Sequence, residues 1–84
     1  MYWVYVLRSI KDKKYYIGQT NNIDVRFIKH NNGKVKSTKS RLPLELIFSK
    51  EFNTRSEAIR TEKRLKGYKN SKYLKYLINK GLVV

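Results

Sequence analysis

The sequence predicts an α+β fold, in which a small three-stranded antiparallel sheet is flanked by helices in the order β-β-α-β-α-α. Two aromatic and β-branched runs, separated by a short polar turn, open the chain, and a third run lies near its middle. Elsewhere the apolar residues recur at helical spacing behind helix-capping residues. A length of 84 residues suits one domain, which we expect to span residues 1–84.

The first two strands are expected from Tyr2 to Ile10 and from Tyr15 to Thr20. Both alternating faces of the first run are mostly apolar, which is typical of a central strand. Lys11 to Lys14 supply a polar turn, so the two runs predict a β-hairpin. With an even number of residues in the connection, Tyr5 and Tyr16 point to the same face of the sheet. An odd number separates them, and the sequence leaves both arrangements open.

The stretch TNNIDVRFIKHNNG predicts a helix that begins after an asparagine cap and ends before Gly33. Ile23, Phe27 and His30 share one face of this helix. Arg26 is an i, i+4 neighbour of His30. A single histidine on an apolar face is more often a hydrogen-bonded core residue than a catalyst. Arg26 equally suits an exposed helix surface. For both residues a structural and a functional role therefore stay open.

A basic loop and a third strand follow. The loop GKVKSTKSRLP offers cations and hydroxyl groups as candidate contacts with a nucleic-acid backbone, namely Lys34, Lys36, Thr38, Lys39 and Arg41. A solvated loop is the alternative reading. From Leu44 to Phe52 polar and apolar residues alternate, which predicts a half-exposed strand. The apolar set is Leu44, Leu46 and Phe48, and the polar set is Glu45, Ser49 and Glu51.

Two further helices are expected in the last third of the chain. TRSE, from Thr54 to Glu57, matches a capping box and predicts a helix from about Arg55 to Gly67. Asn70-Ser71 opens a last helix, which ends before Gly81 and has the apolar residues Tyr73, Leu74, Leu77 and Ile78. Lysines of this segment are further candidate contacts with a backbone, again with a solvated face as the alternative: Lys69, Lys72 and Lys75.

Glu62 is the anomaly of the helix that begins at Arg55. The apolar residues Ala58, Ile59 and Leu65 form its stripe, and Glu62 stands where that stripe should continue. A carboxylate on an inward face costs on the order of a few kcal/mol unless a cation, a metal or hydrogen bonds compensate it. The pattern alone leaves two readings: a partly buried salt bridge, or a carboxylate that binds a divalent metal next to a phosphate substrate.

The charge balance points to a polyanionic partner. Twenty Lys and Arg residues against six Asp and Glu give a net charge of +14, which favours nucleic acid over acidic membranes. A well-solvated, lysine-rich surface is the alternative. The absence of cysteine excludes disulfides and thiolate metal sites. The amino-terminal apolar run is too short for a signal peptide or a membrane span, so we expect a soluble, cytoplasmic protein without membrane association.

These residues together resemble the GIY-YIG nuclease family, in particular its small stand-alone members. The family's first tripeptide corresponds to Val4-Tyr5-Val6, which keeps the tyrosine but lacks the name-giving glycine. The second tripeptide is intact as Tyr16-Ile17-Gly18. The arginine and histidine of the family's next helix match Arg26 and His30, and its metal-binding glutamate matches Glu62.

The resemblance implies metal-dependent hydrolysis of phosphodiester bonds in DNA by an endonuclease. It implies that Tyr5 helps to activate a water as general base, although a phenol needs nearby cations or metal-bound water for this role. Arg26 would stabilise charge on the phosphate, and Glu62 would hold one Mg²⁺ or Mn²⁺. Tyr16 would orient the water or the phosphate, and His30 would support that network.

Three further expectations concern neighbouring positions. Gly18 would let the backbone pass closely where a side chain would obstruct. Tyr15 would face away from Tyr16 and serve in packing. Asn79 is the nearest candidate for a late asparagine of some larger relatives, and no role is assigned to it.

The alternative function is a nucleic-acid-binding module with the same fold and little or no turnover, including one associated with RNA. Basic domains of this size bind nucleic acid broadly through lysine and arginine contacts with phosphates. Larger relatives gain specificity from attached domains, so a partner protein is one expected source of targeting for a chain of this length. The sequence itself leaves the choice between DNA and RNA open.

Overall fold

The computed structural model describes residues 1–68 and 71–79. Its strands β1 (Tyr2–Ser9), β2 (Tyr15–Thr20) and β3 (Leu44–Phe52) form one antiparallel sheet in the order β2-β1-β3. The helices are α1 (Ile23–Asn31), the short 3-10 helix η1 (Lys39–Arg41), α2 (Arg55–Lys66) and α3 (Ser71–Asn79). The predicted α+β class and the order β-β-α-β-α-α are therefore confirmed.

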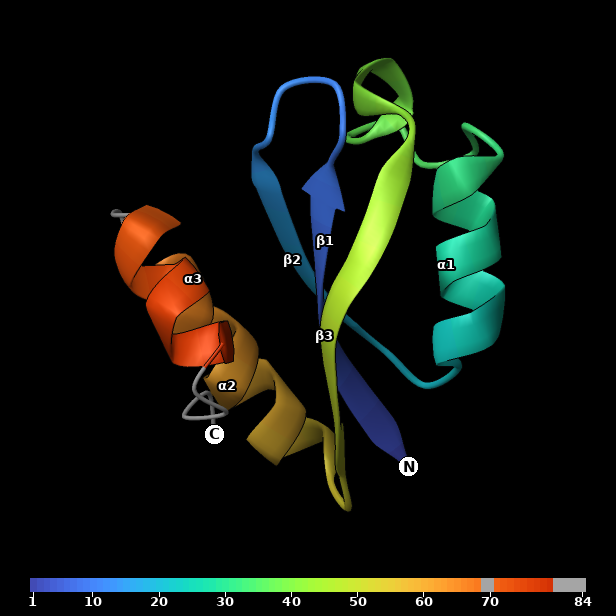
Figure 1. The fold of residues 1–84 in the computed structure, drawn as a ribbon. Coiled ribbons are helices and arrows are strands. Elements are labelled where there is room, and N and C mark those ends of the chain that lie inside the picture. Colours follow the sequence, from blue (N-terminus) through green and yellow to red (C-terminus); the bar gives the residue numbers. More distant parts are fainter. Residues whose placement is uncertain (69–70, 80–84) are drawn as a thin grey trace.

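The sheet separates two apolar clusters, because both faces of the central strand β1 are apolar. Val4 and Val6 pack on one face with residues of α2 and α3. Tyr5 and Leu7 pack on the other face with residues of α1. Figure 1 shows the resulting three layers, with α1 on one side of the sheet and α2 and α3 on the other. The described helices include none that is long and apolar enough to cross a membrane.

The register of the hairpin places the two tyrosines on one face. Tyr5 lies opposite Gly18, and Leu7 lies opposite Tyr16. Arg8 and Tyr15 form the last matched pair, so residues 9–14 connect them, an even number. Since side chains alternate between faces along a strand, Tyr5 and Tyr16 both point to the α1 side.

The prediction that Leu44, Leu46 and Phe48 share one face of β3 is wrong, because the strand is irregular at its centre. Val6 lies opposite Phe48, whereas Leu7 lies opposite Leu46, so the pairing shifts between them. Ile47 is the additional residue of this irregularity, and an additional residue reverses the alternation of side chains beyond it. Leu46 is consequently exposed, while Ile47 and Phe48 pack against the cluster beneath α2.

The helix ends follow the predicted caps. The side chain of Asn22 accepts a hydrogen bond from the Val25 N–H over 3.2 Å at the start of α1. Thr54 caps α2 as expected: its hydroxyl accepts from the Glu57 N–H over 3.3 Å and donates to the Glu57 carboxylate over 3.0 Å. The return bond of a full capping box, from the Thr54 backbone N–H to the Glu57 side chain, is not among the hydrogen bonds of the described residues. Gly33 follows α1 with a positive φ of 72°. The predicted boundaries of the last helix at residues 70 and 81, and Lys69, lie outside the described residues.

Candidate active site

Tyr5 is the centre of a buried polar cluster between β1 and α1. Only 1% of its surface is exposed. Its hydroxyl oxygen lies 3.0 Å from Nε2 of His30, and Nε of Arg26 donates a hydrogen bond to it over 3.3 Å. Arg26 and His30 lie one turn apart on α1, so a single helix face carries both partners. The structure therefore brings together three residues that were predicted separately.

Thr38 is a fourth member of this cluster, which the sequence did not indicate as such. Its hydroxyl lies 2.8 Å from Nδ1 of His30, and both side chains are fully buried. This placement corrects the expectation that Thr38 contacts a nucleic-acid backbone, because a fully buried side chain cannot reach one. Arg41 in the same loop lies 3.9 Å from the Asp12 carboxylate, an ion pair. The loop's exposed cations are Lys34, Lys36 and Lys39.

The charge states in the cluster follow from burial. Burial lowers the pKa of His30 to about 4, and the charge of Arg26 adds to this shift. The imidazole is therefore neutral at pH 7 and has a single N–H. Burial also raises the pKa of Tyr5 above its usual value, against the hydrogen bond from Arg26, which lowers it. Tyr5 is accordingly a neutral phenol.

These charge states select one pattern of hydrogen bonds. The Tyr5 oxygen already accepts from Arg26, so its own proton needs an acceptor. Nε2 of the neutral His30 provides that acceptor, and the remaining N–H of the imidazole, at Nδ1, then donates to the Thr38 hydroxyl. In this tautomer the Tyr5 hydroxyl hydrogen and the Nδ1–H of His30 both have an acceptor. His30 is thus both a buried, hydrogen-bonded core residue and a direct partner of the Tyr5 hydroxyl.

Stability is expected to fall on acidification because His30 is held neutral. Between pH 6.5 and about 4 the unfolded chain binds a proton at this histidine that the folded chain does not bind. Lowering the pH from 7 to 5 should therefore reduce the free energy of unfolding by about 2 kcal/mol through this residue. Urea titrations at both pH values measure the loss. His30→Gln should remove it, and an equal pH dependence in that variant would contradict the assignment.

Tyr16 lies beside this cluster on the edge strand β2. Its ring centroid is 5.0 Å from the His30 ring in an edge-on arrangement, and 6.4 Å from the Tyr5 ring. The side chain is half-buried, in contrast to Tyr5. Tyr16 therefore borders both the buried cluster and the solvent at the sheet edge.

Gly18 makes room for the Tyr5 ring. A Cβ atom at this position would lie 2.6 Å from Cζ of Tyr5 and closer still to its hydroxyl oxygen. Real Cβ atoms do not approach other heavy atoms so closely. The glycine of the second tripeptide is thus explained by the tyrosine of the first, which lies opposite it in the sheet.

Gly18→Ala should displace Tyr5 from its partners and destabilise the fold. Overpacking of this kind costs about 1–3 kcal/mol, and the displaced hydroxyl adds the loss of its hydrogen bonds. Chemical denaturation measures the effect. Gly67→Ala is the matched control. A Cβ atom at Gly67 would lie 3.3 Å from its nearest neighbour, the carbonyl oxygen of Arg64, and the backbone there has a helical φ of –73°. Equal stability of the two variants would contradict this account of Gly18.

Glu62 lies on α2, which packs on the opposite side of the sheet from the Tyr5 cluster, and no hydrogen bond or ion pair joins it to that cluster among the described residues. Its side chain is 19% exposed and lies 3.4 Å from the Lys66 ammonium group one turn later. The fully packed positions of the helix are Ala58, Thr61 and Leu65, so Glu62 lies at the border of the buried face. Its negative charge is one of the smaller causes that raise the pKa of Tyr5. The salt bridge that the pattern allowed is therefore present.

The donor set around Glu62 fits a metal that is shared with a substrate. Within residues 1–68 and 71–79, no three His, Asp or Glu side chains come together as a metal site. Mg²⁺ in phosphate-processing sites is commonly held by one or two carboxylates, with water and substrate phosphates as its other ligands. A single half-buried carboxylate beside a basic surface matches that arrangement.

The fold is that of a GIY-YIG catalytic domain. Residues 1–76 match the family described by that name, and the chain belongs to this family, whose members include nucleases. The resemblance seen in the sequence is thereby confirmed. The sequence predicted a close approach at Gly18, but it indicated neither Tyr5 as the approaching group nor the burial of Thr38 against His30.

The similar proteins are small single-domain members of the family. A UPF0213 protein of Staphylococcus saprophyticus is 40% identical over 81 residues, which cover 95% of this chain and 96% of the relative. A UPF0213 protein of Streptococcus pneumoniae is 38% identical over 76 residues, or 89% of this chain and 76% of the relative. The solution structure of the UPF0213 protein BH0048 from Bacillus halodurans matches with a TM-score of 0.59 and 35% identity, covering 96% of this chain and 87% of that one.

Proposed function

We propose that this protein is a divalent-metal-dependent endonuclease that hydrolyses phosphodiester bonds in DNA. The observation that carries the proposal is the Tyr5 hydroxyl, which contacts Arg26 and His30 at the same time. Here a cation and a neutral imidazole meet at the same oxygen, which suits the transfer of a proton next to a phosphate.

In the proposed reaction Tyr5 takes a proton from the attacking water while its own proton passes to Nε2 of His30. The Nδ1–H bond to Thr38 holds the imidazole in the tautomer that can accept this proton. The hydroxide formed attacks phosphorus, and the bond to the leaving oxygen of the strand breaks. That oxygen takes up a proton from solvent, and His30 releases the proton it received. In this coupling Tyr5 never has to exist as a free phenolate. Because the pKa of the accepting His30 is lowered to about 4, the step also requires that the attacking water be made more acidic, which a divalent metal would supply.

Arg26 and Glu62 act on the phosphate in this proposal. Arg26 contacts Tyr5 through Nε, and its two terminal nitrogens carry further N–H groups that suit phosphate oxygens. Glu62 would hold one Mg²⁺ or Mn²⁺, which lowers the pKa of bound water and neutralises charge on the phosphate. Tyr16, at the border of the cluster, would orient the water or the phosphate.

The strand is proposed to bind through exposed cations. The loop between α1 and β3 offers Lys34, Lys36 and Lys39, and helix α3 offers Lys72 and Lys75. Such contacts act through phosphates and do not read sequence. A partner protein that directs the nuclease to its target is therefore part of the proposal.

The proposal is tested by a panel of labelled DNA substrates: duplex, flapped, branched and single-stranded. Each is incubated with the protein and Mg²⁺ or Mn²⁺, and again with chelator. We expect cleavage of at least one substrate that depends on the metal. Cleavage that persists in chelator would overturn the metal dependence, and an RNA panel run in parallel would reveal a preference for RNA.

A nucleic-acid-binding module with little turnover is the second candidate, and the raised pKa of Tyr5 favours it, since a neutral phenol is a weak base. In that case no substrate of the panel is cut, although binding persists. Binding should weaken with salt, with a slope of about 0.9 log unit per log unit of salt for each neutralised phosphate.

A further inference from the structure

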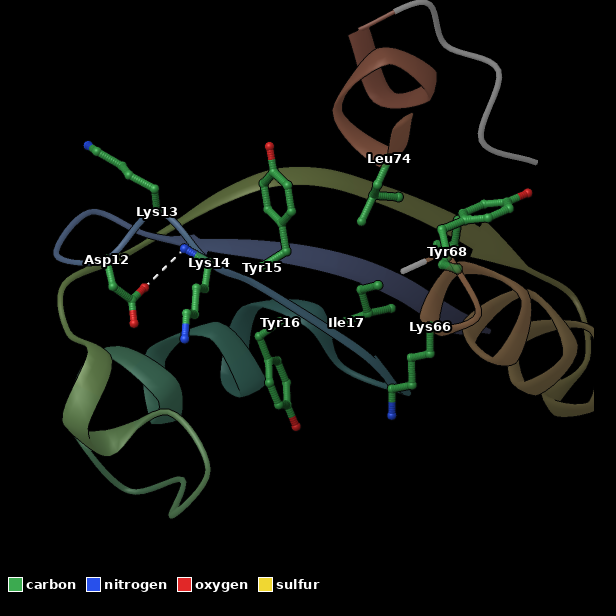
Figure 2. Close-up of a pocket in the computed structure, with 10 residues that line it drawn as sticks. Asp12, Lys13, Lys14, Tyr15, Tyr16, Ile17, Lys66, Tyr68 and Leu74 are labelled. Carbon is green, nitrogen blue, oxygen red and sulfur yellow. Dashed lines mark hydrogen bonds between the residues drawn. The ribbon is translucent and has the colours of Figure 1, made fainter. Parts of the chain in front are cut away.

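We infer that the protein has a nucleobase-binding pocket at the outer edge of β2, which receives one unstacked base of the bound strand. The pocket has a volume of about 600 Å³ and lies between the β1–β2 turn, β2, the end of α2 and α3. Figure 2 shows the side chains around it. The inference rests on the proposed function in one respect only, namely that the ligand is a nucleic-acid strand.

Two tyrosines supply the aromatic surfaces of this pocket. Tyr15 comes from β2 and Tyr68 follows α2, with Ile17 and Leu74 between them (Figure 2). Both rings are half-buried and pack against the core cluster on the α2 side. The Tyr68 ring also contacts the ring of Tyr73 edge-on, with 5.2 Å between the centroids. Half-buried rings that border a pocket offer stacking surfaces, and a base of any type can stack on them.

The rim of the pocket is positively charged. Lys13, Lys14 and Lys66 surround it with a single carboxylate, Asp12. That carboxylate is engaged locally, because it accepts a hydrogen bond from the backbone N–H of Lys14 over 3.0 Å. A ligand that suits the pocket therefore combines a flat apolar part with negative charge. A nucleotide within a strand has both features, since its base can fill the aromatic part while its phosphates contact the lysines.

The pocket adjoins the catalytic cluster through two shared residues. Tyr16 lines the pocket, and its ring also lies edge-on to the His30 ring, with 5.0 Å between the two ring centroids. Lys66 lines the pocket and forms the ion pair with Glu62. A base in the pocket therefore belongs to a nucleotide close to the phosphate that the cluster would cleave. Tyr15, which the sequence suggested only for packing, thereby gains a role in substrate binding.

The test compares two end-labelled single strands of equal length and charge, one with bases and one built entirely of abasic nucleotides. Fluorescence anisotropy in the presence of chelator measures binding without cleavage. The wild-type protein should bind the strand with bases about ten-fold more tightly or better. Tyr15→Leu and Tyr68→Leu should weaken binding of that strand by about ten-fold and leave binding of the abasic strand unchanged.

Matched variants separate stacking from other effects. Tyr15→Phe and Tyr68→Phe keep the ring and should bind like the wild type. Tyr76→Leu removes an exposed tyrosine of α3 that is not among the pocket residues, and should change nothing. Thermal unfolding identifies any variant that no longer folds, and the comparison of the two strands on the wild-type protein then still tests the pocket.

Three results would overturn the inference: equal affinity of the wild type for both strands, equal weakening of both strands by the leucine variants, or a stronger effect of those variants on an acidic peptide. Because no cleavage is measured, a protein that cuts nothing can still confirm the pocket. Conversely, metal-dependent cleavage with unaltered base binding in Tyr15→Leu rejects the pocket alone.

Discussion

Glu62→Gln is expected to abolish metal-dependent cleavage while the protein still folds and binds DNA. The substitution keeps the size of the side chain and removes the one negative charge that the described residues, 1–68 and 71–79, offer to a cation at this site. The ion pair with Lys66 is also lost, but Lys66 is exposed, and partly exposed pairs of this kind contribute about 0.3–0.5 kcal/mol. The effect on catalysis should therefore far exceed the effect on stability.

Single-turnover cleavage, a binding titration and a denaturation curve measure the three quantities on the same preparation. Glu51→Gln is the matched control, because it removes the same charge from an exposed position on β3, the edge strand opposite β2. That variant should cleave like the wild type. Cleavage that survives in Glu62→Gln would rule out the assigned role of this carboxylate.

Tyr5→Phe is expected to lower the rate of cleavage by about 10²–10⁴-fold, the usual contribution of a positioned general base. The ring keeps its place against Gly18 and Leu7, so the apolar packing of the face is preserved. The buried Nε2 of His30 loses its partner, however, and an unsatisfied buried group costs about 1–3 kcal/mol. A measurable loss of stability should thus accompany the loss of activity.

Tyr2→Phe controls for the removal of a phenolic hydroxyl from the same strand. Tyr2 packs on the α2 side of the sheet, away from the cluster around Tyr5. Its variant should retain full activity. If Tyr5→Phe cleaved at the wild-type rate under single-turnover conditions, proton transfer through Tyr5 would be excluded, and the binding module would become the better description.

Local patterns in the sequence determined the elements of this fold. The capping residues Asn22 and Thr54 act where expected, because they satisfy N–H groups of the helix turn directly next to them. The two apolar faces of β1 predicted its central place, since a strand with no polar face has to be covered on both sides. Arg26 and His30 could be assigned to one helix face from their spacing alone.

Tertiary structure decided the features that depend on contacts between distant segments. The parity of the hairpin, which places Tyr16 beside Tyr5, is set by the pairing register. The irregularity opposite β1 reversed the alternation in β3, which no pattern within β3 itself reveals. Thr38 reads as a polar loop residue, and only the fold buries it against Nδ1 of His30.

At Gly18 and Glu62 the sequence indicated an unusual position, and the tertiary structure identified its partner. The sequence identified Gly18 as a place of close approach, and the structure supplied the approaching group, the Tyr5 ring. For Glu62 the pattern allowed a salt bridge or a metal ligand, and the fold provides the salt bridge at the border of a packed face. Spacing along a helix or strand is fixed by local geometry, so the sequence reveals it, whereas the partner across the sheet is chosen by packing of the whole chain.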